Sequence, residues 1–260
     1  MSTNRVSWID LAKSISLVGV IVIHCLDLSN QLAASLTGFV LPAFFILAGI
    51  AHKNEKHRFK IQNLIRSRFI SLMIPYFILS IVMVAIYASL YPSVDVGLAP
   101  SEFAFWTVYG NGPIQRVSHL WYLRALFFAI ILFAIFDRYL HDKHQAFRVL
   151  IALALPGIGV MMRSAAGVEL LPWGIDSTLV GLSFVIIGNE IRRVQGLSSW
   201  SISGPFDTVA VVLSFMFFAL LTLINGYVNI GISIYGLSVY IYLLTGFLGT
   251  YIVSIISFHA

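Results

Sequence analysis

The chain has 260 residues, of which 59% are hydrophobic and only 10% are charged, and its formal net charge is +5. A soluble domain needs more polar side chains than this to cover its surface, so the composition excludes an ordinary soluble protein and predicts a polytopic membrane protein. The basic residues fall in short clusters between apolar runs, which is typical of topology signals and not of a nucleic-acid-binding surface. Cys25 is the only cysteine, which excludes an internal disulfide.

Apolar segments long enough to cross a hydrocarbon core of about 30 Å recur along the chain, with polar breaks between them. They predict an all-α polytopic transmembrane helix bundle of about eight helices, in a single domain over residues 1–260. The fifth segment contains Pro156, Gly157 and Gly159, which favours a kinked or discontinuous helix there. In chain order, the segments are residues 8–28, 32–51, 69–90, 120–136, 149–162, 175–191, 207–224 and 234–257.

The distribution of Lys and Arg predicts the orientation of the helices. Most of the 16 basic residues, including the dense run from Lys53 to Arg68, fall on the side that also holds the N-terminus. Because cytoplasmic loops carry the excess of Lys and Arg, we expect a multi-pass protein of the plasma (bacterial inner) membrane with a cytoplasmic N-terminus. The chain stops at Ala260 without a polar tail, and this abrupt end predicts that a C-terminal segment is missing.

The first helix carries a polar stripe made of Asp10, Lys13, Leu17, Val20 and His24, whose spacing of three and four residues places them on one helical face. Polar groups are costly to bury in a bilayer, so we expect the stripe to turn toward the protein interior or a wet cavity. Asp10 and His24 lie about 21 Å apart along the helix axis and therefore mark its two ends.

A neutral imidazole at His24 could act as a general base for attack by a hydroxyl on an acyl carbonyl, or could itself be acylated. The alternative is a buried histidine that only hydrogen-bonds a neighbouring helix. Asp10 could be an N-cap, an ion-pair partner of Lys13 or a participant in proton transfer.

The second informative region is the basic stretch from His52 to Arg68. Arg66 and Arg68 could offer charge-assisted contacts to a phosphate-rich donor at the start of the third helix, with Lys13 contributing from the first. The alternative is a loop that only fixes topology and contacts anionic lipid. The chain has no Gly-rich phosphate loop, which disfavours ATP hydrolysis.

The fourth helix opens with His119, Trp121 and Arg124, an imidazole, an indole and a guanidinium that could bind an acceptor. The alternative is an aromatic belt with a structural ion pair. Arg124 lies about one turn inside the helix and needs a partner, for which the candidates are Asp176, Glu169 and Glu102.

The longest break between the predicted helices, residues 91–119, lies outside the membrane in this topology. It combines four aromatic residues with a turn from Gly110 to Pro113, and these could form a platform for sugar rings; interfacial anchoring is an equally good interpretation. The aromatic residues are Phe103, Phe105, Trp106 and Tyr109.

Several of these motifs, in this order, resemble the acyltransferase family 3 membrane proteins, and the most similar branch is the fucose 4-O-acetylase type. The resemblance is carried by Trp8 to Lys13 followed by His24, Phe44 to Gly49, Arg68 ahead of Pro75-Tyr76, and His119 to Leu123. It spans nearly the whole chain and implies that the last two helices of the family are absent here.

The resemblance implies an integral membrane enzyme that takes an acetyl group from cytoplasmic acetyl-CoA and delivers it to a carbohydrate hydroxyl, on a cell-surface glycan or its lipid-linked precursor. Acetyl-CoA would be a substrate, with no tightly bound cofactor and no metal, and a homo-oligomer stays open. The implied roles are catalysis for His24 and Asp10, donor binding for Lys13, Arg66 and Arg68, and acceptor binding for His119, Trp121 and Arg124.

This sequence departs from the family pattern at two motifs. The second arginine of the family's paired-arginine motif would fall at Ser71, and the Ser-Gly-Tyr after the second helix is replaced by Ala48-Gly49-Ile50. An inactive truncated member is therefore one alternative. A transporter or flippase for a polar or lipid-linked solute is another, although we find no internal repeat to support it.

Overall fold

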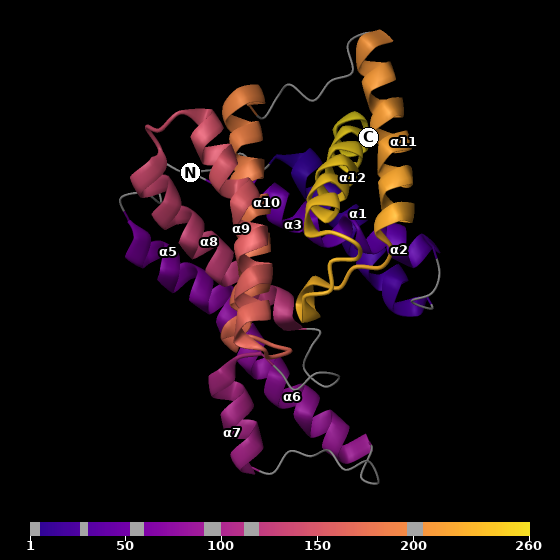
Figure 1. The fold of residues 1–260 in the computed structure, drawn as a ribbon. Helices are drawn as coiled ribbons and strands as arrows, with labels where there is room; N and C mark the ends of the chain where they lie inside the picture. Colours follow the sequence, from indigo (N-terminus) through magenta and orange to yellow (C-terminus); the bar gives the residue numbers. More distant parts are fainter. Residues whose placement is uncertain (1–5, 27–30, 53–59, 91–99, 112–119, 197–204) are drawn as a thin grey trace.

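The computed structural model describes residues 6–26, 31–52, 60–90, 100–111, 120–196 and 205–260. These residues form an all-helical bundle whose one β-type pairing is an isolated bridge between Asn229 and Ile234 (Figure 1). Within them, seven helical segments are long and apolar enough to cross a membrane. The structure thus confirms the predicted all-α polytopic bundle.

The centre of the bundle is α10 (Ile175–Gln195), which packs against α3 (Val40–Ala51), α8 (Trp121–Leu140) and α9 (Gln145–Ala166). Glycines allow α3 and α10 to approach closely: a Cβ at Gly49 would overlap the carbonyl of Val185, and one at Gly188 would overlap the carbonyl of Ile46. Small residues at such a crossing bring two backbones into contact, which is a common way to pack helices in membranes.

Around this centre lie α1 (Ser7–Cys25), which packs on α3 and α12 (Val239–His259), and α11 (Pro205–Asn225), which packs on α12. The predicted segment 32–51 coincides with a candidate membrane span, Gln31–Ala51, but its helix is interrupted at Gly38 and Phe39 between α2 (Gln31–Thr37) and α3. The segment after α11 contains a short helix, η4 (Ile230–Ile232).

The predicted third segment begins earlier than expected, at Ile61. There α5 (Ile61–Arg68), a π-helical turn η1 (Phe69–Met73) and α6 (Ile74–Leu90) follow one another without a break. The π turn ends two residues before Pro75, which lacks an amide N–H and disturbs the α-helical hydrogen-bond ladder. Beyond α6, a further helix α7 (Pro100–Tyr109) lies in the long break between predicted segments.

The fifth segment is one continuous helix, α9, so the alternative of a discontinuous helix at Pro156 is wrong. Its glycines serve close packing instead. A Cβ at Gly159 would meet the backbone of Asp176, and one at Gly157 would meet the Tyr240 hydroxyl. The helix ends at Gly167, whose φ of +64° is the left-handed conformation that favours glycine at this position.

The bundle has two distinct ends. At the basic end, α8 and α10 finish with Arg138 and with Arg192 and Arg193, and α5 begins after Lys60. The ring of Trp8 in α1 contacts Phe258 near the end of α12, so the first described residues share the end at which α12 finishes. At the opposite end, called the far end here, α10 begins and α1 finishes.

Candidate functional site

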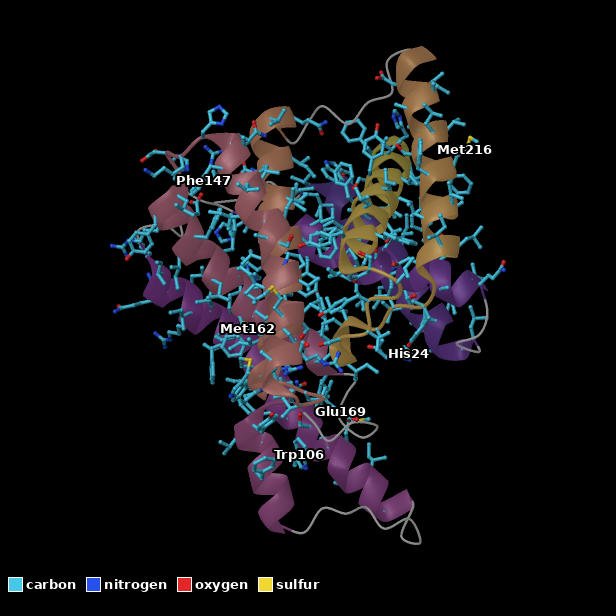
Figure 2. All side chains as sticks on the ribbon, in the orientation of Figure 1. His24, Trp106, Phe147, Met162, Glu169 and Met216 are labelled. Atoms are coloured by element: carbon cyan, nitrogen blue, oxygen red, sulfur yellow. The ribbon has the colours of Figure 1, made fainter. Side chains whose placement is uncertain are left out.

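The polar stripe of α1 borders the packed face of this helix and does not enter it. The packed face is formed by Trp8, Ile9, Ala12, Ser16 and Gly19. Asp10 and Lys13 are half-buried near the basic end, Leu17 is 54% exposed, and His24 is exposed in the last turn at the far end (Figure 2). The expectation that the stripe turns toward the protein interior is thus wrong for Leu17 and His24. The roles assigned to His24, Asp10 and Lys13 stay predictions.

Arg124 lies at the far end, inside the bundle, with 1% of its surface exposed. Its Nη1 donates a hydrogen bond of 2.7 Å to the carbonyl of Gly110, and its guanidinium lies against Gly174, where a Cβ would come within 3 Å of both terminal nitrogens. Asp176, one of the three predicted partners, interacts electrostatically with Arg124. A buried guanidinium needs such a partner to offset its desolvation.

The carboxylate of Asp176 is itself buried in the first turn of α10 and accepts a hydrogen bond from the Ser233 hydroxyl. Ser233 adopts the left-handed conformation, with φ of 57°, just after η4. Arg163 of α9 donates a hydrogen bond of 2.6 Å to the Ser233 carbonyl. Three segments distant in sequence thus meet around Ser233.

Two tyrosines extend this polar cluster toward α12. The rings of Tyr235 and Tyr242 lie 6.2 Å apart, and the buried Tyr242 hydroxyl has no hydrogen-bond partner among the described residues. Burial raises the pKa of the Tyr235 hydroxyl, and the negative charge of nearby Asp176 raises it further, so Tyr235 stays protonated at neutral pH. We name Arg124, Asp176, Ser233, Tyr235 and Tyr242 the far-end cluster.

Strained backbone holds the start of α10 beside Arg124. Trp173 and Gly174, in the short helix η3 (Pro172–Gly174), both have positive φ, 55° and 56°. A non-glycine residue in this region costs about 1 to 3 kcal/mol and persists where its surroundings fix it. The Trp173 ring packs on Phe128 at 5.7 Å, and a Cβ at Gly110 would overlap it.

Of the other two predicted acceptor residues, the structure describes Trp121 but not His119. Trp121 is half-buried at the start of α8 and packs tightly on Gly231 of η4. His119 lies outside the described residues. The structure therefore brings Trp121 and Arg124 to the same end of the bundle as His24 and says nothing of His119.

The aromatic residues of the long break lie on a helix and not around a turn. Phe105, Trp106 and Tyr109 of α7 contact one another, and Phe105 is 54% exposed. The Tyr109 hydroxyl and the Asn111 amide donate hydrogen bonds to the carbonyls of residues 170 and 171, which fastens α7 to the segment before α10.

The predicted donor residues are divided between two sides of the bundle. Arg66 is exposed and Arg68 is half-buried on α5, which packs on α8, whereas Lys13 lies on α1, which packs on α3 and α12. Figure 1 shows α5 and α1 on different sides of α10. The described helices thus do not gather the three cations at one point.

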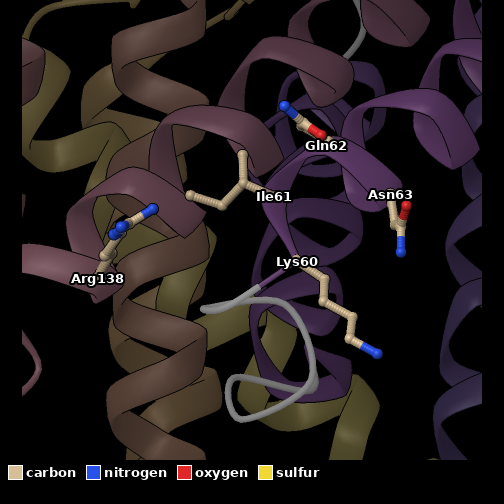
Figure 3. A pocket seen from close by; sticks show the side chains of 5 residues that line it. All are labelled: Lys60, Ile61, Gln62, Asn63 and Arg138. Carbon is tan, nitrogen blue, oxygen red and sulfur yellow. The ribbon is translucent and has the colours of Figure 1, made fainter.

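A pocket of about 370 Å³ opens at the basic end, between the start of α5 and the end of α8. It contains none of the predicted donor residues. The sequence alone counts Arg138 among the topology signals and places Lys60 in the basic stretch that could contact a phosphate-rich donor. Hydropathy does not predict that the two residues lie at converging helix ends. The pocket is lined by Lys60, Ile61, Gln62, Asn63 and Arg138 (Figure 3).

A buried ionic network lies at the same end. Arg148 of α9, fully buried, contacts Glu190 of α10 at 2.5 Å through Nη2 and 2.7 Å through Nε. Asp137 of α8 lies 3.7 Å from its Nη1, and the guanidinium lies over the Phe136 ring. This network was not predicted: Asp137 and Arg148 fall one residue outside the predicted segments 120–136 and 149–162, and Glu190, inside the segment 175–191, was the available signal.

Within the described part of the chain, no group of three or more His, Cys, Asp and Glu side chains could hold a metal ion. A family model described as an acyltransferase domain matches residues 6–260. Neither the curated proteins nor the solved structures contain a significant match.

Proposed function

Since the chain belongs to acyltransferase family 3, whose acyltransferase domain covers residues 6–260, we propose that this multi-pass membrane protein is an O-acetyltransferase. It would move an acetyl group from cytoplasmic acetyl-CoA to a carbohydrate hydroxyl, on a cell-surface glycan or its lipid-linked precursor. The acetyl group and the carbohydrate acceptor rest on the resemblance to the fucose 4-O-acetylase branch. We place the protein in the plasma (bacterial inner) membrane with its basic end in the cytoplasm.

The observation that carries this proposal is the division of polar groups between the two ends of one bundle. Cations that suit a phosphate-rich donor lie at the basic end, and we assign Lys13, Arg66 and Arg68 to donor binding. Polar and aromatic groups that suit a carbohydrate lie at the far end, and we assign His119, Trp121 and Arg124 to acceptor binding. An enzyme that joins a cytoplasmic donor to an external acceptor needs this separation.

In the proposed reaction, the His24 imidazole accepts the proton of the acceptor hydroxyl while the hydroxyl oxygen attacks the thioester carbonyl. The carbon–sulfur bond then breaks, the thiolate of CoA leaves, and the imidazolium returns its proton to the sulfur. Asp10 lies at the opposite end of α1, about 21 Å along the axis, so any catalytic role for it would be in proton exchange on the basic side and not in contact with His24.

The test is acetyl transfer from radiolabelled acetyl-CoA to membrane glycans by the purified protein in liposomes. We expect His24→Ala to lower the rate about 100-fold or more, the usual contribution of a general base. Cys25→Ala is the matched control, because Cys25 is the exposed neighbour of His24 and should leave the rate unchanged. Equal rates for native protein and His24→Ala would remove His24 from the mechanism.

A transporter or flippase for a polar or lipid-linked solute is the second candidate. It is favoured by Arg124 and Asp176, ionisable groups buried in the helices at the far end, because such groups often mark solute pathways in membranes. Solute uptake by the same liposomes without acetylation would support it. The absence of both activities would identify a catalytically inactive member of the family.

A further inference from the structure

The pocket at the basic end is formed where a helix pair separates. Away from the basic end, α5–η1 and α8 are held together by apolar contacts: the rings of Phe69 and Phe127 lie 6.2 Å apart, and Leu64 packs with Ile130 and Ala134. Lys60 and Arg138 lie at the basic end of this helix pair, beyond those contacts. The pocket is lined by four polar or charged residues and by one apolar residue, Ile61 (Figure 3).

The rim of the pocket is positively charged. Lys60 and Arg138 are exposed, and no acidic side chain is among the described residues that line the pocket. Gln62 and Asn63 add two amide groups that can donate hydrogen bonds. Two cations with amide donors around a small cavity suit an anion that has several acceptor oxygens, and a guanidinium matches a phosphate particularly well.

The surface that continues from the pocket indicates where such a phosphate comes from. Ile61 lines the pocket, and Ile65 and Phe69 follow it at intervals of four residues on the same helical face. Ile65 and Phe69 are 38% and 43% exposed, so an apolar strip runs from the pocket toward the membrane interior. A soluble phosphate ester has no apolar chain that could pack on this strip, whereas a phospholipid has.

We propose that the pocket between α5 and α8 binds the headgroup phosphate of an anionic membrane phospholipid, with Lys60 and Arg138 as its cationic contacts. Basic pockets between helices on the cytoplasmic side of a membrane are suited to such headgroups. The lipid chain lies along Ile65 and Phe69. The inference does not depend on acyl transfer, because it uses none of the residues assigned to catalysis or to donor binding.

The test is the dissociation constant of phosphatidylglycerol carrying a fluorescent acyl chain, titrated into delipidated full-length protein in detergent. We expect the double variant Lys60→Ala/Arg138→Ala to bind this lipid about twentyfold more weakly, about four- to fivefold for each cation removed. The matched control is Lys143→Ala/Arg193→Ala, which removes one exposed Lys and one exposed Arg at the same end but outside the pocket. We expect the control to stay within about twofold of the native protein.

Two further measurements separate the alternatives. The exchange Lys60→Arg/Arg138→Lys keeps both charges and should retain most of the affinity, and circular dichroism of each variant reports that the helices have formed. Equal losses in the pocket variant and the control would overturn the proposal in favour of diffuse charge attraction. A pocket variant that loses affinity for free CoA and keeps its affinity for phosphatidylglycerol would overturn it in favour of the donor phosphate.

Discussion

At the scale of single residues, the buried pair of Arg148 and Glu190 determines how the basic end holds together. Glu190→Ala leaves the Arg148 guanidinium buried with the weaker contacts to Asp137, the Leu140 carbonyl and the Phe136 ring. Removing one partner of a buried ion pair costs about 3 to 5 kcal/mol, because the remaining charge loses its compensation. We expect a loss of this size in the free energy of unfolding, measured by denaturant titration in detergent micelles.

The exposed Glu169 offers the matched control, since Glu169→Ala should change the free energy of unfolding by less than about 0.5 kcal/mol. The double variant Arg148→Met/Glu190→Met should recover only part of the stability, because it removes both charges of the pair but takes the Arg148 guanidinium away from the buried Asp137 carboxylate. A single Glu190→Ala variant as stable as the Glu169→Ala control would show that the pair is not stabilising the bundle.

The far-end cluster shows which residue contacts can be predicted from sequence. That Arg124 needs a partner follows from a cation inside an apolar helix, and Asp176 was among the three candidates. The contact of Asp176 with Ser233, and that of Arg163 with the Ser233 carbonyl, depend on the left-handed backbone after η4. No periodicity encodes this turn, so these contacts could not be predicted.

At the scale of helices, the crossing of α3 and α10 rests on Gly49 and Gly188. Gly188→Ala would place a Cβ on the Ile46 carbonyl, and a backbone atom cannot move aside as a side chain can. Overpacking costs about 1 to 3 kcal/mol, and we expect Gly188→Ala to lie at or above the upper end of this range in the free energy of unfolding.

Gly19→Ala on α1 is the control for the crossing, because the nearest atoms to its Cβ belong to side chains, Val40 Cγ1 at 2.7 Å and Leu36 Cδ2 at 3.7 Å, and not to the backbone of another helix. Both substitutions gain similar helix propensity, about 1 kcal/mol, so the difference between them measures the crossing itself. If Gly188→Ala unfolds at the same denaturant concentration as Gly19→Ala, the close approach of α3 and α10 is not needed for stability.

The helices themselves were predicted well where hydropathy decides and poorly where backbone chemistry decides. The apolar runs gave the sites of α1, α9, α10, α11 and α12 to within a few residues. The sequence of α5 is polar, so hydropathy did not predict that the third helical segment begins at Ile61. This helix is stabilised by the packing of Leu64 against α8. The break at Gly38 and Phe39 was missed because both sides of it are apolar.

At the scale of the whole molecule, the alternating direction of the helices follows from the sequence and is confirmed by the contacts. Arg192 at the end of α10 donates hydrogen bonds to the carbonyls of Ile50 and His52 at the end of α3, so these two helices run in the same direction. Ser183 of α10 donates to the carbonyl of Ala152 in α9, and Gly159 lies against Asp176, so α9 runs in the opposite direction. The assignment of the basic end to the cytoplasm rests only on the distribution of Lys and Arg.

The orientation can be tested by labelling single cysteines in intact cells with a membrane-impermeant maleimide. Cys25→Ser first removes the native thiol, and Lys143→Cys or Glu169→Cys then adds one exposed thiol at the basic end or the far end. Because Lys and Arg are retained on the cytoplasmic side, we expect Glu169→Cys to react in intact cells and Lys143→Cys to react only after lysis. The reverse pattern would put the basic end outside and would deny cytoplasmic acetyl-CoA access to Arg66 and Arg68.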